Sequence, residues 1–179
     1  MKAPLTSRRN FLGAGATGLV TGIAGATGLA ATGLATAPAQ AANACGGMTR
    51  AQYDDYVTLF NNADPSFTKY YHDDVVLQLG TTEIKTAKGI RDFYAEVRAH
   101  IHEKVEATHF VSDATGVAVL LPSEFKVYKD WENGFFQRPL KKGEVLRIVS
   151  IGLYWVEGGK FRRILSARQK LVNDWRMEA

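Results

Sequence analysis

The chain has 179 residues, 46% of them hydrophobic and 11% aromatic, so it is long enough to bury a core. All 18 acidic residues follow Ala41, and residues 42–179 carry 19 basic side chains. The full chain therefore has a net charge of +4, whereas residues 42–179 alone have a net charge of +1. This near balance excludes a broadly basic surface, and we expect no nucleic-acid partner. Because Cys45 is the single cysteine, an intramolecular disulfide is also excluded.

The start of the chain has the pattern of an export signal. Arg8 and Arg9 precede an uncharged run rich in Gly, Ala and Thr over 13–35, and Ala39-Gln40-Ala41 is typical of a cleavage site. This segment resembles a bacterial twin-arginine signal peptide. We therefore expect residues 1–41 to be removed after the twin-arginine translocase exports the folded protein, which would be periplasmic or secreted. An uncleaved N-terminal anchor is the alternative.

Residues 42–48 are expected to form a flexible tail before a single domain over 49–179. Cys45 lies in this tail. Its thiol is either free or, after cleavage at Ala44, modified by a lipid. The 138 residues after Ala41 are enough for one domain, and they contain no internal repeat.

Three helices are predicted in the first half of this domain. The first begins after the N-cap Thr49, with Gln52 completing a capping box, and ends near 61–62. Its apolar stripe comprises Tyr53, Tyr56, Val57 and Phe60. A short helix is predicted over Pro65–Tyr71, with proline at its first position. A third begins after Thr86 and carries the stripe Ile90, Phe93, Tyr94, Val97 and Ile101.

The second half of the domain predicts strands. Apolar and β-branched runs indicate strands at 75–79, 105–112, 116–127, 143–156 and 160–171. Helices early in the chain and a run of antiparallel strands later indicate an α+β fold. We expect the strands to form a curved antiparallel sheet that wraps around the long helix as a half-open cone.

Four stretches of the domain carry a family resemblance. They are 55–64, 71–77, 89–94 and 159–164. With them the chain resembles the nuclear-transport-factor-2-like (NTF2-like) superfamily, and within it the SnoaL-like polyketide cyclases and their isomerase and dehydratase relatives. The resemblance implies a cone-shaped α+β barrel with an apolar pocket between the sheet and the first helices. It also implies a small apolar or aromatic ligand, no metal or organic cofactor, and a homodimer.

The resemblance suggests three catalytic candidates. Tyr56 matches the tyrosine that donates to the oxyanion in ketosteroid isomerases, and the alternative is a core tyrosine. His109 is the candidate general base and Asp64 its orienting carboxylate, as in related dehydratases. The alternatives are a packed histidine and an N-cap for the second helix. Leu79 stands where the isomerases have their base, so isomerase chemistry on steroids is not expected.

Further residues are candidates for substrate binding. Phe60 and Leu79 are expected to line the pocket, Arg168 in the last strand is expected to anchor an anionic or carbonyl group, and Glu124 is a secondary candidate. Trp131 and Phe135 lie in a long Gly- and Pro-containing segment, Tyr128–Pro139, that predicts a lid. A dimer contact is the alternative for this segment. Arg168 and Glu124 are otherwise solvated strand residues.

His100 and His102 are interpreted as residues that end the third helix, where a cationic side chain is favourable. They have no carboxylate or cysteine companion at metal-ligand spacing, so no metal site is expected. The preferred hypothesis for the domain is an exported, cofactor-independent lyase, dehydratase, isomerase or cyclase that acts on a small aromatic or polycyclic compound. The alternative is a non-catalytic protein that binds a small ligand or assists assembly in the periplasm.

Overall fold

The computed structural model describes residues 47–132 and 134–178, so the predicted export signal and Cys45 lie outside the described residues. The elements follow the chain as α1 (Arg50–Asn61), the 3-10 helix η1 (Pro65–Tyr70), β1 (Tyr71–Leu79), β2 (Thr82–Lys85), α2 (Ala87–Arg98), β3 (Ile101–Val105), β4 (Thr108–Ser112), β5 (Gly116–Val127), β6 (Glu144–Glu157) and β7 (Lys160–Met177). None of the described helices is long and apolar enough to cross a membrane.

The N-terminus of α1 forms as the sequence predicts. The Thr49 side chain accepts a hydrogen bond from the Gln52 backbone, and the Gln52 side chain accepts one from the Thr49 backbone at 2.8 Å, which completes the capping box. Tyr53, Tyr56 and Phe60 form the buried face of this helix. The predicted stripe therefore faces the interior.

The predicted third helix is shorter than its apolar stripe. Helix α2 begins after Thr86, as expected, but it ends at Arg98, with Ala99 as its C-cap. Ile101 has the helical spacing, yet it begins β3 and pairs with Val127 of β5. Pairing with a strand that is distant in sequence therefore overrides the helical pattern at this end.

The interpretation of His100 and His102 as residues that end a helix is consequently wrong for His102, which lies in β3, whereas His100 directly follows the C-cap Ala99. The His100 ring stacks on Trp131, with 4.9 Å between ring centroids and 7° between planes. His102 lies in β3, and its ring stacks on Tyr128 at 4.4 Å. Both histidines pack against the segment that follows β5.

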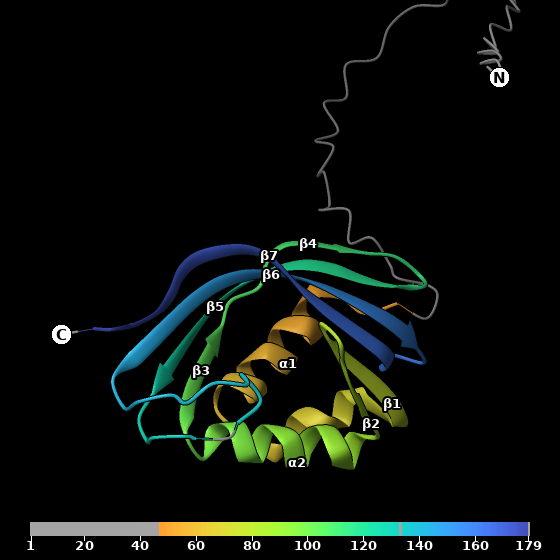
Figure 1. Cartoon of the computed structure of the whole chain (residues 1–179). Helices are drawn as coiled ribbons and strands as arrows, with labels where there is room; N and C mark the ends of the chain where they lie inside the picture. The colour runs from red at the N-terminus through yellow and green to blue at the C-terminus, as the bar shows by residue number, and fades with distance from the viewer. Residues whose placement is uncertain (1–46, 133, 179) are drawn as a thin grey trace, which may run out of the picture. The chain divides into compact units, whose positions relative to one another are not determined.

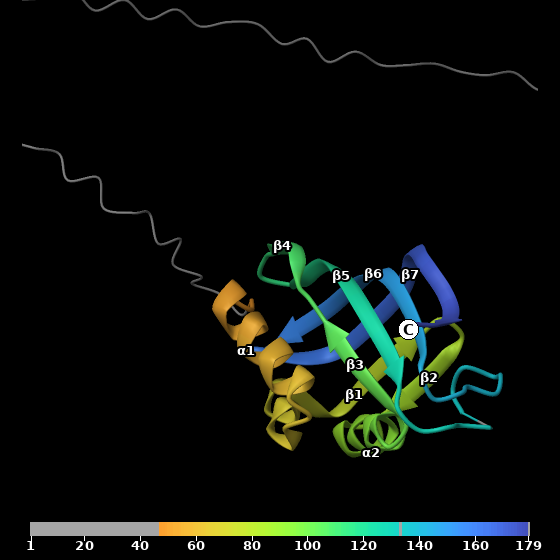
Figure 2. The same ribbon diagram turned by 90° about the vertical axis from the view of Figure 1, so that its left-hand side faces the viewer.

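The strands form one curved sheet in the order β2-β1-β7-β6-β5-β3, and β4 also pairs with β5. The sheet curls over α1 and α2, which both lie on its concave side (Figure 1). The view from the side shows the same half-open cone (Figure 2). The predicted α+β cone is confirmed, with one difference in strand direction: β1 runs parallel to β7, whereas the other neighbouring strands are antiparallel.

Several strand boundaries differ from the expectation, and the first is that β1 begins at Tyr71 rather than at 75. The strand predicted at 105–112 is two strands, β3 and β4, which pair with successive parts of β5. Strand β7 extends to Met177 rather than to 171, because it follows β6 back to Glu144. The extra length of β7 includes Trp175, whose ring packs edge to face on Phe136, with 5.0 Å between centroids.

Two apolar clusters hold the domain together. The larger one joins the buried face of α1 to β1, β5, β6 and β7, with Tyr53, Phe67 and Phe161 almost fully buried. The smaller one lies at the C-terminal end of α2 and contains Val97, Ile101, Val127, Trp131 and Leu140. The space between the helices and the sheet is not completely filled by these clusters.

Candidate functional site

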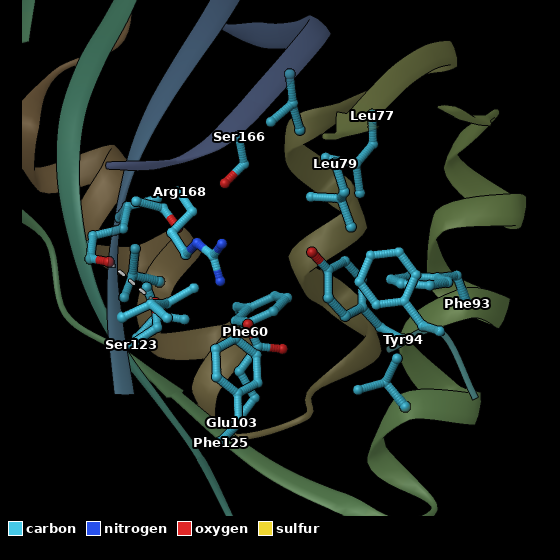
Figure 3. Close-up of a pocket in the computed structure, with 18 of the residues that line it drawn as sticks. Phe60, Leu77, Leu79, Phe93, Tyr94, Glu103, Ser123, Phe125, Ser166 and Arg168 are labelled. Atoms are coloured by element: carbon cyan, nitrogen blue, oxygen red, sulfur yellow. Dashed lines mark hydrogen bonds between the residues drawn. The ribbon is translucent and has the colours of Figure 1, made fainter. Parts of the chain in front are cut away.

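A cavity of about 380 Å³ lies between α1, α2 and the concave face of the sheet. Successive inward positions of β5, β6 and β7 form one wall, and aromatic side chains of the helices form the other (Figure 3). Its volume is within the range of small-molecule sites, about 300–1,000 Å³. We call it the central cavity.

Aromatic rings make most of the apolar lining. Phe60 and Tyr94 meet edge to face, with 4.8 Å between centroids and 89° between planes. Phe93 and Phe135 meet in the same way at 5.2 Å. Rings held edge to face present flat surfaces on which a planar ligand can pack. The central cavity is therefore suited to an aromatic or polycyclic compound.

Glu103 is the acidic side chain of the cavity lining. It lies at the middle of β3, paired with Phe125 of β5, and its carboxylate points into the cavity (Figure 3). Among the described residues the carboxylate has neither a hydrogen bond nor an ion pair. Burial raises the pKa of this carboxyl to about 7, and the positive charge of Arg98 partly opposes the shift. Near neutral pH both the acid and the carboxylate are populated.

Arg168 is the basic side chain of the lining. It lies in β7 opposite Ser150 of β6, it is exposed to solvent, and its guanidinium points into the cavity (Figure 3). The Ser166 hydroxyl lies two residues earlier on the same face. Within the part of the chain that the structure describes, Arg168 forms no ion pair and no side-chain hydrogen bond. Its donors are available to a ligand.

Tyrosine hydroxyls occupy the buried end of the cavity. The Tyr56 and Tyr71 oxygens lie 3.0 Å apart and share a hydrogen bond. Burial raises the pKa of Tyr56, Tyr71 and Tyr94 well above the ordinary value, and raises the pKa of Tyr154 to about 12. These phenols therefore stay protonated at physiological pH and can donate hydrogen bonds.

Five of the predicted site residues line the central cavity. They are Tyr56, Phe60, Leu79, Phe135 and Arg168. Leu79 lies at the end of β1 and the aromatic side chains come from α1 and from the segment after β5. The structure thus brings together the predicted oxyanion donor, the apolar walls and the predicted anchor.

His109 is not among the residues that line the cavity. It is exposed, and its backbone adopts a positive φ of 48° at an irregularity in the β4–β5 pairing. Strand alternation does place His109 and Val111 on one face, but that face is the exposed one, while Phe110 packs against the core. A base at this cavity must come from another residue.

Asp64 is also outside the cavity lining. It is the N-cap of η1, where its carboxylate accepts a hydrogen bond from the Ser66 backbone at 2.8 Å. This hydrogen bond lowers the pKa of Asp64. The structure does not bring His109 and Asp64 together at the central cavity, and the capping alternative accounts for the geometry of Asp64.

Glu124 and Trp131 have partners elsewhere. Glu124 pairs with Arg147 of β6, with an N–O distance of 2.6 Å, and does not line the cavity because β5 directs its odd-numbered residues Ser123 and Phe125 inward. Trp131 is only 7% exposed and belongs to the smaller apolar cluster. Neither residue can contact a ligand in the central cavity in this structure.

Sequence reasoning missed Glu103. The helical stripe through Ile101 concealed the alternation of Ile101, Glu103 and Val105, which all point inward from β3. An end to the helix at Ala99 would have placed one carboxylate between two buried apolar residues of a strand. That pattern marks an acidic side chain in an apolar environment, where a shifted pKa is expected. Among the described residues, no cluster of three or more His, Cys, Asp or Glu side chains is arranged to hold a metal ion.

No protein-family model matches the sequence, and neither does any curated protein. Solved structures do share its fold. An LEH-like epoxide hydrolase of M. tuberculosis is 11% identical, with a TM-score of 0.54 over 66% of this chain and 80% of that one. A SnoaL-like polyketide cyclase of Agrobacterium tumefaciens is 22% identical, with a TM-score of 0.51 over 66% and 89%.

An NTF2-like protein of unknown function from Burkholderia pseudomallei is also similar. It is 11% identical, with a TM-score of 0.52 over 66% of this chain and 88% of that one. At these identities the likeness establishes the NTF2-like fold and leaves the chemistry to the residues of the cavity.

Proposed function

We propose that this chain is an exported, cofactor-independent acid/base enzyme of the lyase, dehydratase, isomerase or cyclase type. Its substrate is a small aromatic or polycyclic compound held in the central cavity. The observation that carries the proposal is the Glu103 carboxylate, which points into an aromatic cavity with no hydrogen-bond or ion-pair partner among the described residues. A general base works best when its pKa is near the operating pH.

The tyrosines supply the second half of the chemistry. Glu103 lies close enough that its charge contributes, after burial, to the raised pKa of Tyr94, Tyr154 and Tyr56. In the proposed reaction the carboxylate takes a proton from a carbon next to a carbonyl group. The resulting enolate oxygen accepts hydrogen bonds from neutral phenols. These preorganised donors stabilise the negative charge in a site shielded from water. The protonated Glu103 then returns the proton to another position.

Two of the similar structures are described as enzymes, an epoxide hydrolase and a polyketide cyclase. This supports a catalytic use of the cavity, by analogy of fold. The residues proposed for the work differ from the sequence-based hypothesis, because Glu103 takes the role assigned to His109. Tyr56 keeps its proposed role as a donor.

The test uses a neutral two-ring ketone, 2-tetralone, in deuterated buffer. An enzyme of this type should accelerate exchange of the protons next to the carbonyl group, which NMR measures directly. Glu103→Gln should lower the accelerated rate by ~10²–10⁴. Glu96→Gln, which changes an exposed glutamate of α2, is the matched control and should leave the rate unchanged.

The non-catalytic alternative has a specific observation in its favour: the lining is mostly apolar, and the predicted pair His109 and Asp64 lies outside it. A wild-type protein that binds ring compounds without accelerating exchange would support that alternative. Full exchange activity in Glu103→Gln would leave the enzyme proposal standing but remove Glu103 from its centre.

Export is a proposal that rests on the signal sequence alone. A double change of Arg8 and Arg9 to lysine should keep the protein in the cytoplasm, because ammonium groups do not replace paired guanidinium groups at a recognition site. Fractionation of cells that express both forms measures this. A normal exported yield from the double variant would reject the twin-arginine assignment.

A further inference from the structure

Arg168 differs from the other arginines of β7. Arg162 pairs with Asp74, Arg163 donates to the Gln78 side chain, and Arg176 lies near Glu178. Among the described residues only Arg168 of this group has no such partner, and it is also the one that lines the central cavity. A guanidinium without an intramolecular partner, aimed into a binding cavity, is free to bind an anion.

Glu103 and Arg168 are the two charged residues among the described lining residues, and they do not form an ion pair with each other. The space between them is therefore available to a ligand that contacts both. The rings of Phe60, Phe93 and Tyr94 line the same cavity (Figure 3). The cavity thus offers a cation near its opening, flat aromatic walls in the middle and a carboxylate further in.

We propose that the substrate is a ring compound with an anionic oxygen group, such as a carboxylate or an ionised enol, and that Arg168 binds this group at the mouth of the central cavity. This inference rests on the proposed function, because it assigns a substrate class to the same site. The Ser166 hydroxyl, two residues before Arg168 on the same face, is placed to donate a second hydrogen bond to the anion.

The orientation of the ligand follows from this assignment. With its anionic group held at Arg168, the apolar body of the ligand extends between the aromatic walls toward Glu103. A reacting carbon on the far side of the rings then lies next to the carboxylate, and the like charges of ligand and Glu103 stay apart. A ligand bound the other way round would place two negative charges together in an apolar environment, which is strongly unfavourable.

The test compares two probes of the same shape that differ in charge, 2-naphthoate and 2-naphthamide, binding to the purified full chain in titration calorimetry. For the wild type we expect 2-naphthoate to bind more tightly than 2-naphthamide. Arg168→Met should lower the affinity for 2-naphthoate about tenfold, as expected when one charge-assisted contact near solvent is lost. The same substitution should change the affinity for 2-naphthamide by less than about twofold, because the aromatic contacts remain.

Two further variants make the test specific. Arg168→Lys keeps the charge but loses the planar fork, and should restore part of the affinity for 2-naphthoate. Lys170→Met removes a nearby cation of β7 that does not line the cavity, and should leave both affinities unchanged.

Three outcomes would overturn the inference: equal losses for both probes, no loss of 2-naphthoate in Arg168→Met, or no binding of 2-naphthoate to the wild type. The result is separable from the proposed function. A protein that exchanges no protons but shows this charge selectivity would keep Arg168 as an anion anchor and reject the enzyme. A protein that exchanges protons of 2-tetralone without the charge selectivity would support the enzyme and reject Arg168 as an anion anchor.

Discussion

The hydroxyl oxygens of Tyr56 and Tyr71 lie 3.0 Å apart at the buried end of the central cavity. Helix α1 supplies the first and the start of β1 supplies the second, so the pair joins two elements that are separated by η1. Both residues are less than a tenth exposed. Because each phenol has its proton at physiological pH, the pair can donate one hydrogen bond internally and one to a bound oxygen atom.

Tyr56→Phe removes one of these two donors. We expect the rate of proton exchange in a bound ketone to fall by ~10²-fold, because the developing oxyanion loses a preorganised hydrogen bond. The free energy of unfolding should fall by only about 1 kcal/mol, since Tyr71 loses its partner but the ring packing remains. NMR exchange and chemical denaturation measure the two effects. Tyr70→Phe is the control, because the Tyr70 hydroxyl donates to Asp55 outside the cavity lining.

Glu103 predicts a specific pH dependence of stability. The pKa of this carboxyl is about 7 in the folded chain and has its ordinary value of 4.5 in the unfolded chain. Between these values the folded state binds more protons, so its stability falls as the pH rises from about 4.5 to about 7. Above that range the full cost of holding the carboxylate in the cavity is present, about 3 kcal/mol at most.

Glu103→Gln removes this cost. The variant should therefore have a higher Tm than the wild type at pH 8, and the difference should shrink toward zero as the pH falls to 4, because both side chains are then neutral. Thermal unfolding at several pH values checks the trend, with Glu96→Gln as a control that shows no such difference. A Tm of Glu103→Gln that is lower than wild type at pH 8 would mean that the carboxylate is stabilised by partners in solution.

Local sequence patterns correctly predicted the start of α1 and the bounds of β5. The capping box at Thr49 set the start of α1, and the turn residues around β5 set its bounds at 116–127, as predicted. The end of α2 is different, because Ile101 continues the helical stripe and only its pairing with Val127 makes it a strand residue. Non-local pairing therefore decided the one boundary that concealed Glu103.

The predicted catalytic pair was misplaced for a related reason. The direction in which His109 points depends on the irregular pairing between Thr108 and Val111, where the backbone takes a positive φ at His109. No local signal in the sequence marks such an irregularity. Tyr56, in contrast, lies in the regular helix α1, and its predicted inward direction agrees with the lining of the cavity. Arg168 also lines the cavity, although the β6–β7 pairing shifts register between the Val149–Lys170 and Ser150–Arg168 pairs.

The segment Tyr128–Pro139, predicted as a lid, has two parts with different roles. Trp131 exchanges two backbone hydrogen bonds with Leu140, at 2.9 and 2.8 Å, and its ring is buried against His100. Phe135 lies in the cavity lining and packs on Phe93 of α2. We infer that Trp131 fastens the segment to the domain, while Phe135 contacts the ligand.

Truncation of each side chain should separate these roles. Trp131→Ala should lower the free energy of unfolding by about 3 kcal/mol or more, because it empties a buried site. Phe135→Ala should leave Tm nearly unchanged but weaken 2-naphthamide by ~30-fold, from about 2 kcal/mol of lost aromatic contact. Unfolding and calorimetric titration on the same two samples measure both. Equal loss of stability in the two variants would contradict this division.

The outer face of the sheet carries an exposed apolar patch. It comprises Val111, Ile151, Leu153 and Trp155, with Val111 67%, Ile151 38% and Trp155 45% exposed. The β6 members alternate with Ser150 and Tyr154, which face the central cavity, so the patch lies on the opposite side of the sheet. We propose that a second copy of the chain covers this patch, as the family resemblance implied.

Ile151→Glu should then shift the sedimentation coefficient from dimer to monomer at micromolar concentration, because a charge at the middle of an apolar interface is costly to bury. Met177→Glu is the matched control. It places the same charge on an exposed apolar residue at the C-terminal end of β7. Met177 pairs with Glu144 and lies outside the patch. Affinity for 2-naphthoate should be equal in all three proteins, since the patch and the cavity lie on opposite faces of the sheet. A wild type that sediments as a monomer, or a dimer that persists in Ile151→Glu, would reject this interface.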